Sequence, residues 1–300
     1  MCTCIFLKGT SSYFGRNMDI HYSFNEKIIF VNKDYQIDLK KEKELILKYS
    51  ILGIGAMVNN YPLFADAMNE KGLAIAGLNF LGNAFYFECE ENKINIAPYE
   101  LPLFLLGTCC NLNEVKEILK KINIVNIPFS KELMLSELHF MVSSKEGSIV
   151  IEQTKEGLKV YENEFNVLTN NPPFPCHKNN MVNYSNLSLD ISYNKVSYGE
   201  GLIGLPGDYS SMSRFIKAYF LTKYISLKED NILQFFYCLD SVLMPKGLVR
   251  VGKQYEYTRY QVCYDLEEKY LYYKTYENRN IKQIDMFMYI NEEIKELNLF

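Results

Sequence analysis

MCTCIF at residues 1–6 and FGRNMDI at residues 14–20 flank the turn-forming segment GTSS at 9–12. Apolar and β-branched residues on both sides of such a turn predict a β-hairpin at the start of the chain. Cys2 then has two interpretations. It is either an apolar residue of the first strand, or a nucleophile that becomes the N-terminus once Met1 is removed.

The rest of the chain alternates between strand-like and helical stretches. The segment at 64–80 indicates two strands around an Asn-Glu-Lys-Gly turn, in which Gly72 supplies the permissive backbone. The segment at 111–122 has apolar residues at helical spacing, with Asn113 as its expected N-cap. We also expect strands at 27–32, 138–144, 148–153, 157–163, 165–170, 256–266, 269–277 and 282–289, and helices at 97–109 and within 209–242.

This order of elements favours an α+β fold, a four-layer αββα sandwich of two antiparallel sheets flanked by helices. Periodicity alone indicates only a mixture of helices and strands, because it does not determine how sheets stack. The sequence contains no internal repeat and no obvious linker, so we expect one domain over residues 1–300.

Composition excludes several classes of function. The net charge is −4 and no long basic stretch occurs, so nucleic-acid binding is not expected. No apolar run of 18 residues and no secretory signal occur, so we expect no membrane span and a cytoplasmic location. The 8 cysteines are scattered, no Cys-x-x-Cys occurs and only 3 histidines are present, which predicts neither a disulfide framework nor a metal site. We expect no cofactor.

An N-terminal Cys2 would carry its own base. An α-amino group has a pKa of about 7.7–8.0, which suits general acid–base catalysis near neutral pH. On the predicted hairpin Arg16 can lie near Cys2 and stabilise its thiolate. Asp19 can accept a hydrogen bond from the amine, but its three-residue spacing from Arg16 requires a bend or bulge near 17–18 if both are to face Cys2. The ordinary alternatives are that the cysteine only fills space in the core, and that the arginine and aspartate form an ion pair on the surface.

Acyl transfer also needs hydrogen-bond donors for the oxyanion. Asn79 and Asn170 each lie at the end of a predicted strand and can supply a backbone or side-chain N–H. Arg214 lies near the start of a helix, where its charge opposes the helix dipole and a specific partner is therefore expected. The ordinary alternatives are that the asparagines only stabilise turns at strand ends, and that the arginine is a solvated surface residue.

These motifs resemble the choloylglycine hydrolase family, which comprises bile salt hydrolases and penicillin V acylases within the N-terminal nucleophile hydrolase superfamily. The segments that carry the resemblance run in family order over nearly the whole chain: MCTCIF, FGRNMDIHYSFN, YPLFADAMNEKGL, AGLNF, IVIEQTKEGLKVYEN, VLTNNPPF, GLPGDYSSMSRF and TYEN. The resemblance implies an αββα fold and a cysteine nucleophile exposed by removal of Met1. It assigns the nucleophile to Cys2, the thiolate-facing arginine to Arg16, the amine-orienting aspartate to Asp19, the oxyanion donors to Asn79 and Asn170, and a second active-site arginine to Arg214.

The resemblance also bears on the substrate. Bile salt hydrolases of this family usually carry Asn where this chain has Asn79, whereas the type penicillin acylases carry Tyr. Apolar loops are expected to line the acyl pocket, and the residues we assign to substrate binding are Met18, Phe24, Tyr61, Phe64, Ile127, Phe129, Leu133 and Leu135. Each of them can equally be core.

Two departures from the family pattern stand out. Leu81 replaces a proline found in many relatives, and residues 175–203 form a shorter segment than in typical bile salt hydrolases. Because that region carries an assembly loop in the family, its shortening puts the usual homo-tetramer in doubt.

The sequence therefore predicts hydrolysis of the amide bond of glycine- or taurine-conjugated bile salts. The alternatives are a penicillin V or N-acyl-homoserine lactone acylase on the same scaffold, and a catalytically silent module that binds bile acid or lipid. The expected partner is a small-molecule substrate, within a homo-oligomer.

Overall fold

The N-terminal hairpin lies at the centre of one sheet of the computed structural model, which describes residues 1–189, 201–228 and 231–300. Strand β1 (Cys2–Lys8) pairs antiparallel with β2 (Ser12–Ile20), in an unbroken register from Cys2 opposite Met18 to Lys8 opposite Ser12. At Gly15 only glycine fits, because a Cβ there would lie 1.9 Å from the carbonyl oxygen of Val262 on the next strand. The hairpin thereby packs closely into its sheet.

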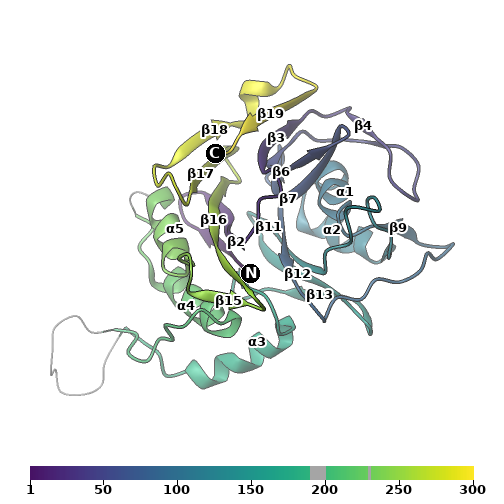
Figure 1. Ribbon diagram of the computed structural model, residues 1–300. Helices are drawn as coiled ribbons and strands as arrows, with labels where there is room; N and C mark the ends of the chain where they lie inside the picture. Colours follow the sequence, from purple (N-terminus) through teal and green to yellow (C-terminus); the bar gives the residue numbers. More distant parts are fainter. Residues whose placement is uncertain (190–200, 229–230) are drawn as a thin grey trace, which may run out of the picture.

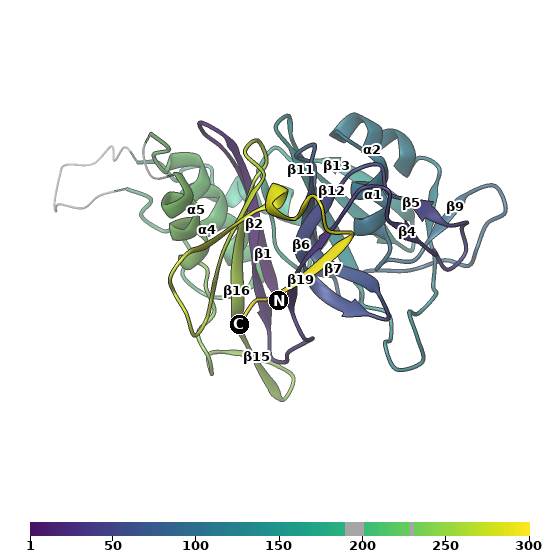
Figure 2. The same cartoon turned by 90° about the horizontal axis from the view of Figure 1, so that it is seen from above.

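Two antiparallel sheets face each other (Figures 1 and 2). The first sheet has the order β14 (Val167–Leu168), β1, β2, β16 (Gln254–Asp265), β17 (Tyr270–Thr275) and β18 (Lys282–Asp285), with β15 (Val249–Val251) paired to β16. The second has the order β13 (Gly157–Glu162), β12 (Gly147–Thr154), β11 (Leu138–Ser144), β8 (Ala74–Asn79), β7 (Tyr61–Asn69), β6 (Ile51–Val58), β3 (Lys27–Val31) and β19 (Ile294–Asn298). Two short pairs lie outside them, β4 (Gln36–Ile37) with β5 (Leu45–Ile46), and β9 (Ile94–Ile96) with β10 (Ile122–Ile124).

Helices cover the outer face of each sheet, as Figure 2 shows from above. Helices α4 (Ser211–Tyr224) and α5 (Asn231–Asp240) pack on the first sheet, and α1 (Leu101–Thr108) and α2 (Leu112–Leu119) pack on the second. The remaining helical segments are α3 (Phe174–Asn180), η1 (Met181–Tyr184) and η2 (Met286–Tyr289). The predicted αββα sandwich is therefore confirmed.

The local predictions are mostly confirmed, with three corrections. Asn113 lies inside α2, whose N-cap is Asn111, because the Asn111 side chain accepts a hydrogen bond from the backbone N–H of Glu114. The predicted strand at 282–289 ends at Asp285, whose side chain caps the following 3₁₀ turn. In the segment 165–170 only Val167–Leu168 pairs as a strand. No helix within the described ranges is long and apolar enough to cross a membrane.

Candidate active site

The side chains of Cys2 and Arg16 meet between the two sheets. Cys2 and Cys4 share one face of β1, and Arg16 lies directly opposite Cys4 on β2. From there its guanidinium reaches along the strand, and Nη2 donates a hydrogen bond to Cys2 Sγ. Arg16 is fully buried, and although burial opposes its charge, the negative groups around it raise its pKa above the ordinary value. A permanent positive charge thus faces the Cys2 sulfur.

Asp19 approaches Cys2 from the other face of the sheet. A bend or bulge near 17–18 would be required only if Arg16 and Asp19 faced Cys2 from the same side, and β2 has none in its pairing with β1. The register shift lies in the neighbouring strand β16, between Thr258 and Tyr260. Asp19 therefore keeps the opposite orientation to Arg16, and its Oδ1 accepts a hydrogen bond from the Thr258 hydroxyl at 2.6 Å. Arg16 and Asp19 therefore lie on opposite faces of the first sheet. This placement needs no distortion of β2.

Met1 is attached to Cys2 in this structure. Its ammonium group donates to the carbonyl oxygen of Asp19 at 2.5 Å and pairs with the carboxylate of Glu256. The nitrogen of Cys2 is consequently a peptide amide. Burial raises the pKa of Asp19, and among the described residues its Oδ2 finds no hydrogen-bond donor.

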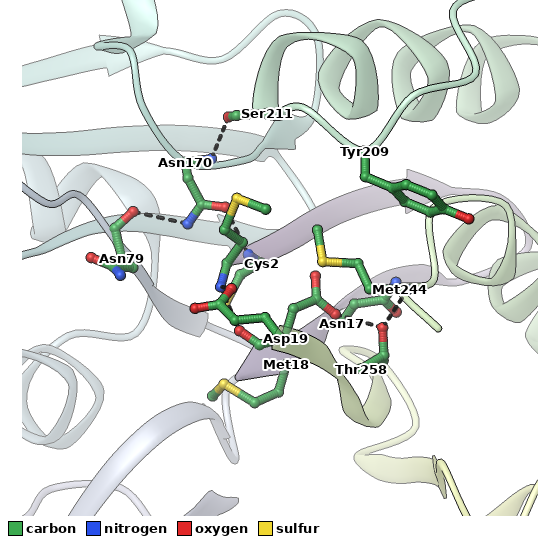
Figure 3. A network of polar contacts seen from close by, with 12 residues as sticks. Cys2, Asn17, Met18, Asp19, Asn79, Asn170, Tyr209, Ser211, Met244 and Thr258 are labelled. Atoms are coloured by element: carbon green, nitrogen blue, oxygen red, sulfur yellow. Dashed lines mark hydrogen bonds and ion pairs between the residues drawn. The ribbon is translucent and has the colours of Figure 1, made fainter. Parts of the chain in front are cut away.

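Hydrogen bonds of its side chain and of its backbone N–H orient Asn170 beside Cys2, and Figure 3 shows Asn79 and Ser211 among its partners. Its Oδ1 accepts from the Cys2 backbone N–H at 2.7 Å and from Arg214 Nη2 at 3.0 Å. Its Nδ2 donates to the backbone carbonyl of Asn79 at 2.9 Å, and its own N–H donates to Ser211 Oγ at 2.8 Å. Because both acceptor bonds fix Oδ1, the amide nitrogen must point toward Asn79. The structure therefore brings the two predicted asparagines together.

Arg214 holds the backbone of the first strand. It lies in the first turn of α4, and its Nη1 donates to the Cys2 carbonyl at 2.5 Å and to Thr3 Oγ1 at 2.6 Å. Together with its bond to Asn170, these contacts supply the partner that its unfavourable place at a helix start led us to expect. All six residues of the predicted catalytic set thus lie around the end of the first strand.

The substrate-binding predictions are less concentrated. Met18 lies opposite Cys2, and its Sδ is 3.7 Å from Arg16 Nη2. The others lie elsewhere in the fold. Phe24 packs beside the inter-sheet core, and Tyr61 and Phe64 lie in the core under α1, with the Phe129 ring 5.4 Å from that of Tyr61. Ile127 and Leu135 are half-buried, and Leu133 is exposed. Within the described ranges, the hydrogen-bonded cluster at Cys2 includes Met18 and none of these seven.

Sequence reasoning missed the residues that support the set. Ser211 bonds to Asn170, and Thr258 bonds to Asp19. His177 is buried, and its Nε2 lies 2.9 Å from the carbonyl oxygen of Asn170. A hydroxyl or a lone histidine far along the chain gives no local signal of such a contact. In the described part of the chain no group of three or more His, Cys, Asp or Glu side chains could hold a metal ion.

Comparison with known proteins bears directly on this geometry. The model of linear amide C–N hydrolases, choloylglycine hydrolase family, matches residues 2–294. The chain belongs to the choloylglycine hydrolase family. It is 46% identical to a bile salt hydrolase/transferase of Lactiplantibacillus plantarum, over 95% of this chain and 92% of that protein. It is 43% identical to a bile salt hydrolase/transferase of Clostridium perfringens, over the same shares.

Solved structures of this family agree with the fold. A mutant of the conjugated bile acid hydrolase from Clostridium perfringens superposes with a TM-score of 0.92 at 41% identity, covering 100% of this chain and 97% of that one. The penicillin V acylase from Agrobacterium tumefaciens gives a TM-score of 0.80 at 19% identity, covering 100% and 92%. The choloylglycine hydrolase scaffold is thus present over the whole chain.

Proposed function

We propose that this choloylglycine hydrolase cleaves the amide bond of glycine- or taurine-conjugated bile salts, with Cys2 as nucleophile after removal of Met1. The observation that carries the proposal is the contact of the Arg16 guanidinium with the Cys2 sulfur. A thiolate is the reactive form of cysteine, and a neighbouring positive charge favours it. The bile salt hydrolases among the relatives supply the substrate class.

In the proposed reaction the Cys2 α-amine takes the thiol proton, and the thiolate attacks the amide carbonyl carbon. The tetrahedral intermediate collapses as the C–N bond breaks, and the ammonium of Cys2 gives its proton to the departing glycine or taurine nitrogen. The same amine then takes a proton from water, whose oxygen attacks the thioester carbonyl carbon. The C–S bond breaks, the bile acid leaves, and the proton returns from the amine to the Cys2 sulfur. Within the described ranges Asp19 Oδ2 has no hydrogen-bond partner, and its burial beside the N-terminal segment supports a role in orienting that amine.

We assign stabilisation of the oxyanion to Asn79 and Asn170. Asn170 Nδ2 carries two hydrogens and donates one of them to Asn79 O, which leaves the second for the substrate. A donor of this kind contributes about 3–4 kcal/mol of transition-state stabilisation in comparable sites. Arg214 donates hydrogen bonds to both Asn170 Oδ1 and the Cys2 carbonyl, and so fixes their relative positions.

We assign the acyl side of the substrate to apolar residues of which Met18 in β2 lies opposite Cys2, while the others lie further away, in β7 and in connecting segments: Phe24, Tyr61, Phe64, Ile127, Phe129, Leu133 and Leu135. A steroid needs such walls, because burial of apolar surface contributes roughly 25 cal/mol per Å². A second activity is acyl transfer, since an amine can replace water in attack on the thioester and two relatives are named hydrolase/transferase.

The deciding experiment measures amine release from glycocholate, taurocholate and penicillin V side by side, on protein whose loss of Met1 is verified by intact mass. We expect both conjugates to be cleaved faster than penicillin V. Faster cleavage of penicillin V would favour the acylase alternative. Tight binding of bile acid without cleavage of any substrate would favour the silent binding module.

For assembly and location we propose a cytoplasmic homo-oligomer. The family's tetramer depends on a loop within 175–203, of which residues 190–200 lie outside the described ranges. Light scattering coupled to size-exclusion chromatography tests this point, and a monomeric mass would contradict it.

A further inference from the structure

Asp66 is a buried carboxylate that the proposed reaction does not use. It lies in β7, next to a bulge of the second sheet: Asp66 pairs with Ile54 and Phe64 pairs with Gly55, so Ala65 has no partner of its own. Asp66 is completely buried. A buried carboxylate is costly unless charged or hydrogen-bonded partners surround it, so Asp66 depends on its neighbours.

Those neighbours come from the opposite sheet. The hydroxyl of Tyr264 donates to Asp66 Oδ1 at 2.6 Å, and the hydroxyl of Tyr260 donates to Oδ2 at 2.7 Å. Oδ2 is also 3.9 Å from Nη1 of Arg16. Burial raises the pKa of Asp66, while the Arg16 charge and the hydroxyls of Tyr264 and Tyr260 act in the opposite direction and favour its carboxylate form. Asp66 is therefore the nearest negative charge to the guanidinium that faces Cys2.

The position of Arg16 does not depend on Asp66 alone. Three backbone carbonyls accept from its guanidinium: Gly77 O at 2.6 Å, Ala65 O at 3.3 Å and Asn17 O at 3.4 Å. Loss of the Asp66 charge would leave these bonds in place. Asp66 thus acts on Arg16 chiefly through charge, and the guanidinium stays where it can touch Cys2.

Two negative groups share this one cation. An arginine does not lose its proton in a protein, so a buried Arg16 beside a neutral thiol needs another anion, and Asp66 supplies it. Asp66 also competes with the thiolate for the same charge. The tyrosine hydroxyls draw electron density from the carboxylate and so weaken that competition. We propose that Asp66, held by Tyr260 and Tyr264, is a positioning residue that determines how much of the Arg16 charge reaches the Cys2 sulfur.

The inference rests on the proposed function only in taking Cys2 as the nucleophile. The other titratable or charged groups around this sulfur, from every element packed against it, are Cys4 on β1, Asp19 on β2, Tyr260 and Glu256 on β16, and Arg214 on α4. None of them is substituted in an Asp66 variant, but the Asp66 charge also raises the pKa of Cys4 and of Tyr260. Variants of Tyr260 and Tyr264 therefore accompany the Asp66 variant in the test.

The test is the pH–rate profile of Cys2 alkylation by iodoacetamide, with the Cys2 peptide quantified by mass spectrometry because other cysteines also react. Asp66→Asn removes the competing charge, and we expect its profile to move to lower pH, with alkylation about tenfold faster on the acidic limb. Tyr260→Phe removes the donor on Oδ2, and we expect the opposite displacement. Tyr264→Phe is the matched control, with a smaller displacement because Oδ1 is not the oxygen nearest Arg16.

Circular dichroism and the thermal midpoint establish that each variant is folded. A folded Asp66→Asn or Tyr260→Phe protein with an undisplaced profile overturns the proposal, as do displacements of the same sign. If Asp66→Asn does not fold, the alkylation profiles of Tyr260→Phe and Tyr264→Phe are compared instead. Equal profiles for these two variants overturn the proposal. The readout needs no substrate, so a chain that leaves bile salts intact would refute the proposed function and still test this inference.

Discussion

His177 makes the stability of this protein depend on pH at a point next to the active site. The ring is buried, stacks on Phe215 with centroids 4.7 Å apart, and lies 2.9 Å from the carbonyl oxygen of Asn170. Its Nδ1 has no partner among the described residues, so a proton added there would be buried without an acceptor. Burial accordingly lowers the pKa of His177 from 6.5 to about 4.

The sign of the effect follows from linkage. A folded-state pKa below the unfolded one means that the unfolded chain binds the proton first as pH falls. The contribution of His177 is complete above pH 6.5 and is lost progressively as pH falls toward 4. The two pKa values correspond to a loss of about 2 kcal/mol at pH 5 and about 3 kcal/mol below pH 4.

The assay is urea denaturation of the wild type and of His177→Gln at pH 7.5, 6, 5 and 4.5. Glutamine can still donate to the Asn170 carbonyl but does not titrate. The wild type alone should lose stability through this position as pH falls. We therefore expect the difference in free energy of unfolding between the two proteins to narrow by about 2 kcal/mol from pH 7.5 to 5. His21→Gln is the matched control, because His21 is exposed. Parallel curves for wild type and His177→Gln over this range would refute the reasoning.

Three further results are expected. Cys2→Ser should abolish measurable release of glycine or taurine from conjugates in protein that has lost its initiator residue, and near-normal turnover would contradict the assignment. Ser211→Ala removes the acceptor for the Asn170 backbone N–H, so denaturation should show a loss of about 1–3 kcal/mol, together with a lower kcat. Thr258→Val removes the donor to Asp19 Oδ1 and the acceptor of the Met244 backbone N–H, so the pH profile of kcat should move. An unchanged profile would exclude a role of the Thr258–Asp19 hydrogen bond in orienting the amine.

The clustering of the six candidate residues around Cys2 was predictable from the sequence because they lie in segments with their own local signals. Cys2 follows the initiator residue, and Arg16 and Asp19 lie on the returning strand of the hairpin. Asn79 ends β8, and Asn170 lies two residues beyond β14. The order of strands and helices favoured the sandwich, and the family resemblance implied it, whereas periodicity alone does not determine how sheets stack. The irregular pairing beside Asp19 was not predicted, because the register shift lies in β16, about 240 residues away from Asp19 in the chain.

The supporting residues could not be predicted, because their contacts join distant parts of the chain. Asp66 meets Tyr260 and Tyr264 across 194 and 198 residues of sequence. His177 follows Cys176, yet the ring is buried against Asn170 while Cys176 is exposed. Hydrophobic periodicity reports which face of an element is buried, but it carries no information about the polar group that will lie opposite.

Chain ends are usually the most loosely held part of a domain. Here the first residues form an inner strand, paired on one side with β2 and on the other with β14, and Cys2 is only 4% exposed. An affinity tag ahead of Met1 would keep the cysteine nitrogen inside the polypeptide and would displace the ammonium from Glu256. Phe300 is 53% exposed, so a purification handle belongs there.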